Sequence, residues 1–158
     1  MTTLFVSLHE RPTHPHLRLL QFGEVRYGEH CECPLVHKIT SLEGPGGVVC
    51  VDAEILASPP KMGKPEVEEM PGHELVKLRK KVRVFKLALA PGQELDYQYS
   101  FFHLIVVAKN GKLQVNDSYT AEKKPGDMQF GEPAGFSTKV KNVGDSEFSW
   151  FIIQWREY

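Results

Sequence analysis

The chain has 158 residues, a usual length for one domain, and its 41% hydrophobic and 25% charged residues are typical of a globular protein rather than a disordered or membrane-inserted one. Its 19 basic and 20 acidic residues leave a net charge of -1, so we expect no overall attraction to nucleic acid or to an anionic membrane. No apolar run approaches the roughly 20 residues that a membrane-spanning helix needs.

Short runs of β-branched and aromatic residues, separated by glycines and prolines, predict an all-β protein. The only helical alternative, over residues 67–78, is broken by Pro71 and Gly72. In chain order, the predicted strands are residues 4–8, 17–22, 35–40, 47–56, 82–90, 102–108, 112–115, 128–130, 137–143 and 147–156.

The turn sequences between these strands predict antiparallel connections. A proline followed by a glycine, as at Pro91 and Pro125, favours a type II turn. Asn110-Gly111 is typical of a type I′ hairpin, and Gly144-Asp145 of a type II′ hairpin. The triplet that begins at Asn116 matches a glycosylation sequon, but we interpret it as a hairpin turn because the chain shows no export signal.

A proline-rich stretch divides the chain into unequal parts. Residues 57–75 contain four prolines and alternating charges, which predicts a linker or surface loop between residues 1–56 and 76–158. The last strand is apolar on both faces, so both should be covered, one by the protein core and the other by the amino-terminal segment or a second subunit. We therefore expect the chain to self-associate as a dimer.

The second part carries a motif with a recognisable spacing. Gly126 is followed by Pro133-Ala134-Gly135, then by Thr138 and Asn142. This spacing resembles the second conserved motif of the cupin superfamily, with one extra residue before the proline and Thr138 in place of the ligand histidine. The resemblance implies a cupin-type antiparallel jelly-roll barrel over residues 76–158, with additional amino-terminal strands.

The first cupin motif places two histidines and a glutamate ahead of a glycine. Counted back from Gly111, the glutamate position falls on Leu104, and the histidine positions fall on Gln98 and Ser100 or, in the alternative register, on Tyr97 and Tyr99. These side chains cannot supply the three or four donors that a transition metal needs, so we expect no metal or other cofactor in this barrel. His103, beside the glutamate position, is expected on the opposite strand face unless a one-residue bulge turns it inward.

The first part looks like a partial repeat of the second. Tyr27-Gly28-Glu29, residues 34–41 and residues 48–56 run parallel to Phe130-Gly131-Glu132 and the two last strands, an offset of about a hundred residues. The resemblance therefore implies a bicupin-like protein with a shortened first barrel. His37 stands where the second-motif histidine belongs. The possible metal ligands of this part are His14, His16, His30, Cys31, Cys33 and His37.

These donors leave two interpretations open. The Cys31-x-Cys33 and His14-x-His16 spacings do not match the usual zinc patterns, so buried strand cysteines and surface histidines compete with a metal site. The cysteines number three in all, and with no secretory signal the odd number favours a reduced, cytoplasmic protein.

A basic cluster precedes and enters the strand at residues 82–90. Stacking aromatic residues are not interleaved with these cations, so a solvated sheet edge is favoured over a nucleic-acid surface. The cluster consists of Lys77, Arg79, Lys80, Lys81, Arg83 and Lys86.

The leading functional interpretation is a metal-free cupin that binds a small polar molecule or serves as a structural or interaction module. One alternative is a metal-independent isomerase or epimerase with His103 as base and Tyr97 or Tyr99 as acid. A second alternative is a metal-dependent oxygenase or isomerase assembled around His37. The expected ligand-binding residues at the barrel mouth are Tyr97, Gln98, Tyr99, Ser100, His103 and Thr138.

Overall fold

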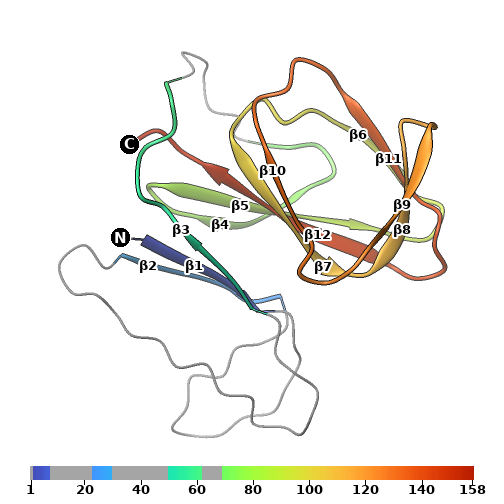
Figure 1. The fold of residues 1–158 in the computed structure, drawn as a ribbon, viewed down its shortest axis with the longest axis horizontal. Coiled ribbons are helices and arrows are strands. Elements are labelled where there is room, and N and C mark those ends of the chain that lie inside the picture. Colours follow the sequence, from blue (N-terminus) through green and yellow to red (C-terminus); the bar gives the residue numbers. More distant parts are fainter. Residues whose placement is uncertain (1, 8–22, 30–49, 62–68) are drawn as a thin grey trace, which may run out of the picture. The chain divides into compact units, whose positions relative to one another are not determined.

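The computed structural model describes residues 2–7, 23–29, 50–61 and 69–158 (Figure 1). This part of the chain contains twelve strands, which pair antiparallel, and confirms the predicted all-β class. Within it, no helix is long and apolar enough to cross a membrane. The chain divides into two compact units, Met1–Ala57 and Ser58–Tyr158.

The amino-terminal unit contains one three-stranded sheet, with β1 (Thr2–Ser7) between β2 (Val25–Glu29) and β3 (Cys50–Glu54). Among the described side chains of β2 and β3, Val25 and Val51 are buried. The predicted strands at residues 17–22 and 35–40 lie outside the described residues, as do residues 34–41 and 48–49 of the proposed repeat.

The second unit, which we call the barrel unit, consists of two antiparallel sheets with strand orders β10-β7-β12-β5-β4 and β6-β11-β8-β9 (Figure 1). Its strands are β4 (Glu74–Leu78), β5 (Val82–Leu89), β6 (Glu94–Tyr97), β7 (His103–Lys109), β8 (Gly111–Val115), β9 (Tyr119–Lys123), β10 (Met128–Gly131), β11 (Thr138–Asn142) and β12 (Phe148–Trp155).

The hydrophobic core of the barrel unit lies between these two sheets, because alternate residues of each strand point to one face. Strand β12 is central to the five-stranded sheet, and every residue from Phe148 to Gln154 is buried, as its two apolar faces predict. The buried members of the core are Met70, Phe85, Leu87, Leu89, Tyr99, Phe101, Ile105, Val107, Leu113, Val140, Phe148, Trp150 and Ile152.

Four strands were not predicted: β2 in the amino-terminal unit, and β4, β6 and β9 in the barrel unit. Each of the three in the barrel unit lies at the end of its sheet in the strand order, so it is exposed along one edge and carries charged residues that interrupt the apolar alternation. β4 begins at Glu74, within the stretch that the prolines mark as a loop.

The two predicted proline-glycine turns are confirmed. Gly92 and Gly126 have φ values of 78° and 88°, and hydrogen bonds from Gln93 N to Ala90 O and from Asp127 N to Lys124 O close the two turns.

The two predicted glycine hairpins are wrong, because neither Gly111 nor Gly144 adopts a left-handed conformation. The type I′ geometry occurs instead between β8 and β9, where Asn116 and Asp117 have φ values of 50° and 54°. Gly111 is instead the first residue of β8, and its backbone lies close to Phe148: a Cβ atom at this position would be 2.8 Å from the Cβ atom of Phe148.

Candidate functional site

One continuous row of side chains points from the β6–β7 segment into the barrel. Tyr99, Phe101 and His103 are only 3%, 5% and 6% exposed, and the half-buried Tyr97 packs against the core. Gln98 is exposed. Of the two registers that the sequence left open, the structure therefore adopts the one in which Tyr97 and Tyr99 face inward.

A β-bulge explains why His103 belongs to this row. The register between β12 and β7 shifts between Ser149 and Trp150, which face Lys109 and Val107, so Ala108 is an extra residue. A count back from Gly111 that does not allow for this extra residue assigns the inward position to Leu104 instead of His103. The expectation that His103 lies on the opposite face is thus wrong, and the one-residue bulge that would turn it inward is present.

The middle of the barrel is filled by aromatic rings. Tyr97 stacks on Tyr99 with ring centroids 4.4 Å apart, and Trp150 meets Tyr97 edge-on at 5.8 Å. Phe148 packs against Trp150 at 5.3 Å. Burial raises the pKa of Tyr97 to about 12 and also raises the pKa of Tyr99, so both phenols stay protonated at neutral pH.

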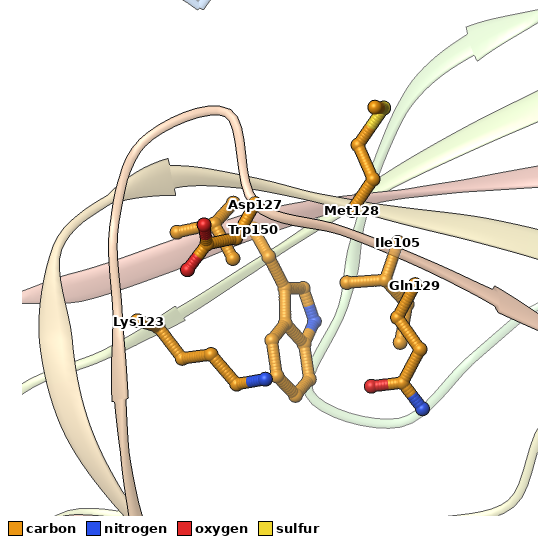
Figure 2. Close-up of a pocket in the computed structure, with 7 residues that line it drawn as sticks. Ile105, Lys123, Asp127, Met128, Gln129 and Trp150 are labelled. Atoms are coloured by element: carbon orange, nitrogen blue, oxygen red, sulfur yellow. The ribbon is translucent and has the colours of Figure 1, made fainter.

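A small cavity lies beside this aromatic packing, where β9 and β10 meet the barrel wall. Its volume is about 20 Å³, which suffices for roughly one water molecule and not for an organic ligand. Figure 2 shows the indole of Trp150 among the lining side chains. None of the predicted ligand-binding residues lines it; its walls are Ile105, Val107, Lys123, Asp127, Met128, Gln129 and Trp150.

The ligand position of the second cupin motif lies opposite the first motif. Thr138 on β11 is half-buried and lies directly opposite Tyr97 on β6. Hydrogen bonds hold the intervening loop in place, from Gln98 Nε2 to Ala134 O at 3.0 Å and from Ser137 Oγ to Tyr97 O at 3.2 Å. Gln98 therefore fixes the loop from outside the barrel. Ser100 is half-buried.

Tyr99 has a hydrogen-bond partner that the sequence did not suggest. His73, just before β4, lies with Nε2 2.9 Å from the Tyr99 hydroxyl and Nδ1 2.9 Å from Pro71 O. Since a carbonyl can only accept, Nδ1 carries the proton and Nε2 accepts from the Tyr99 hydroxyl. Burial lowers the pKa of His73, although the bond to Pro71 opposes this effect.

We expect His73 to make the barrel less stable in acid. Because its pKa is lower in the folded chain than the ordinary value of 6.5, the unfolded chain binds the proton first as the pH falls. This contribution to stability is complete above about pH 6.5 and is lost as the pH falls towards the folded pKa, with a slope of at most about 1.4 kcal/mol per pH unit.

The measurement is urea unfolding at pH 7.5 and pH 5.0 for the wild type and for His73→Gln, whose side chain does not titrate. The variant should lose less stability between the two pH values. An identical loss in both proteins would contradict the role of His73, because the other titrating groups are common to them.

His103 is also held as a neutral ring. Its Nδ1 lies 2.8 Å from Phe101 O and donates to it, so Nε2 is an acceptor. Burial lowers its pKa against the opposing effect of that hydrogen bond. The ring packs edge-on against Tyr99 at 4.7 Å and lies against Gly131 of β10. No hydrogen bond joins His103 to Tyr99 in the described part of the chain, because the Tyr99 hydroxyl is bonded to His73.

Two further buried polar residues continue across the sheet from His103, and the sequence analysis assigned neither of them to the site. Gln154 on β12 stands directly opposite His103 on one side and Arg83 on the other. Arg83 is 5% exposed and Gln154 is 3% exposed. The basic cluster is therefore not solvated throughout, because Arg83 points inward, with its guanidinium 5.9 Å from the ring of Phe85. The sequence does contain a signal for Gln154, because it is a polar residue at an inward position of an otherwise apolar strand.

The side chains at the four cupin ligand positions do not fit a transition metal. Tyr97, Tyr99, His103 and Thr138 occupy the four positions, and a single imidazole among them is too few ligands. Among the described residues no group of three or more histidine, cysteine or acidic side chains could hold a metal ion. The other candidates, His14, His16, His30, Cys31, Cys33 and His37, lie outside the described residues.

No protein-family model matches the sequence, and no curated protein matches it. A cupin domain from Bordetella pertussis is similar at 22% identity, over 57% of this chain and 99% of that chain, with a TM-score of 0.47. A conserved protein with a double-stranded β-helix domain from Klebsiella pneumoniae follows at 18% identity, over 57% and 79%, with a TM-score of 0.42. An RmlC-like cupin family protein from Methanocaldococcus jannaschii has 12% identity, over 60% and 86%, with a TM-score of 0.43. At these values the likeness concerns the fold and implies no ligand or reaction.

Proposed function

We propose that the chain is a metal-independent, cupin-like binding module that holds a small polar molecule at one end of its barrel. The observation that carries this proposal is the line of three buried polar side chains, Arg83, Gln154 and His103, on neighbouring strands. Burying polar groups costs free energy unless they are hydrogen-bonded. Polar groups gathered on an otherwise apolar inner wall are a common way to orient a ligand.

The alternatives receive less support. The middle of the barrel is packed with aromatic rings, so a ligand beside Tyr97 and Thr138 would have to displace them. Proton transfer between Tyr99 and His103 lacks a hydrogen bond, since the Tyr99 hydroxyl donates to His73. Self-association as a dimer stays a prediction.

The test is ligand-dependent stabilisation measured by thermal unfolding in the presence of EDTA. Glycerol, glycolate, glycine and butyramide serve as probes, because they present different polar groups at similar small size. We expect at least one to raise the unfolding midpoint in a concentration-dependent manner, since a ligand that binds only the folded state stabilises it. His103→Leu should abolish the increase, whereas the exposed-site variant Gln98→Leu should retain it.

Two results would overturn the proposal. If no probe raises the midpoint of the wild type, the barrel is a structural or interaction module rather than a binding one. If a probe acts only when EDTA is omitted, the binding depends on a metal, and the metal-dependent alternative replaces the present proposal.

A further inference from the structure

The side chain of Gln154 contains a hydrogen-bond acceptor that the described protein leaves unused. Its Oε1 atom is fully buried and has no hydrogen-bond partner among the described residues. Gln154 lies near the end of β12, a strand that is otherwise apolar along its inward face. A buried acceptor without a donor destabilises the folded chain, so a group that supplies the donor would be bound favourably at this position.

His103 places a second acceptor on the same wall. Because its Nδ1 donates to Phe101 O, the neutral ring has its lone pair on Nε2. His103 stands directly opposite Gln154 on the neighbouring strand, and side chains in this relation begin about 5 Å apart. The inner wall therefore presents two acceptors next to each other, at the end of the barrel where β7 begins and β12 ends.

Arg83 places a positive charge at this end of the barrel. It lies on the other side of Gln154, on β5, and its guanidinium is always protonated. A cationic ligand beside a buried guanidinium meets like-charge repulsion, which is weakly screened away from water. An uncharged or anionic ligand meets none.

We propose that the ligand of this site is an uncharged or anionic molecule whose amide N–H or hydroxyl O–H group donates to Gln154 Oε1 and His103 Nε2. This inference rests on the proposed binding function and adds the chemical class of the ligand. A molecule with acceptors alone leaves both acceptors unpaired, and an ammonium group supplies donors but carries the wrong charge.

Three probes with similar numbers of non-hydrogen atoms test this chemistry on the wild-type chain. Butyramide is uncharged and has two N–H donors, N,N-dimethylacetamide keeps the amide without a donor, and butylamine is a cationic donor at pH 7. Binding is measured from the unfolding midpoint and from the NMR signals of the Gln154 side-chain amide and the His103 ring. We expect butyramide to bind at least tenfold more tightly than either of the others.

The Gln154→Met variant removes the acceptor oxygen but keeps a side chain of similar size and shape. Removing an unpaired buried acceptor should raise the unfolding midpoint of the ligand-free protein by about 2–4 °C and should abolish butyramide binding. The control, Gln129→Met on the neighbouring edge strand, replaces an exposed glutamine and should leave both measurements unchanged.

Each contrary outcome has a distinct meaning. Equal binding of N,N-dimethylacetamide and butyramide overturns the donor requirement while the proposed binding function stands. Stronger binding of butylamine overturns the charge assignment. A lower midpoint for Gln154→Met shows that Oε1 already has a partner, such as a bound water, and removes the basis of the inference. If none of these probes binds and the wider set also fails, the proposed function itself fails.

Discussion

Asn142→Ala is expected to lower the free energy of unfolding by about 3–5 kcal/mol. Asn142 is 0% exposed and its side chain makes three hydrogen bonds. Nδ2 donates to Leu89 O at 2.9 Å and to Ser146 O at 2.8 Å, and Oδ1 accepts from Gly144 N at 3.0 Å. Alanine removes all three and leaves the buried Leu89 carbonyl without this donor.

Urea and thermal unfolding measure this effect, and the midpoint should fall by on the order of 10 °C. Asn142→Asp provides a sharper comparison, because its carboxylate keeps the acceptor for Gly144 but sets an oxygen against two carbonyl oxygens. It should destabilise at least as much as alanine. The exposed Asn110→Ala should stay within about 0.5 kcal/mol of the wild type. Wild-type stability in both Asn142 variants would show that these bonds do not hold the β11–β12 connection.

Gly131→Ala is expected to destabilise the barrel by about 1–3 kcal/mol through overpacking. A Cβ atom at Gly131 would overlap the imidazole of His103 at Nε2 and Cε1. The ring cannot turn aside freely, because Nδ1 is bonded to Phe101 O and the ring edges contact Tyr99 and Phe101. The added methyl group should therefore also disturb the site that contains His103.

A double-mutant cycle tests whether the collision with His103 causes the loss of stability in Gly131→Ala. His103→Ala removes the ring, so the same methyl group at position 131 should cost less in that background, with a coupling energy of about 1–2 kcal/mol. Gly135→Ala is the matched control, since a Cβ atom there meets nothing within 4 Å. Strict additivity of the Gly131 and His103 variants would contradict the proposed collision.

Apolar periodicity was sufficient to predict the strands that form the centre of the barrel, such as β5, β7 and β12. It could not predict the register of the first motif. That register depends on the bulge at Ala108, and alanine carries no local signal for an extra residue. One unpaired residue changes which side chains face the core, and the inward position passes from Leu104 to His103.

The candidate site was only partly predictable for a related reason. His103 and the tyrosines were identified from motif spacing, whereas Arg83 was grouped with neighbouring cations because sequence proximity hides the face on which a strand residue lies. The pairing of Gln154 with His103 joins residues about fifty positions apart, and it follows from sheet topology alone. The same holds for the hydrogen bond from Tyr99 to His73.

The four sheet edges of the barrel unit differ in their protection against polymerisation. β4, β6 and β9 carry charged side chains, which oppose the addition of a further strand from another molecule. β10 has the sequence Met-Gln-Phe-Gly, without a charge, and exposes 60% of Met128 and 58% of Phe130. Of the four edges, β10 is therefore the one whose side chains least oppose the addition of a strand from another molecule.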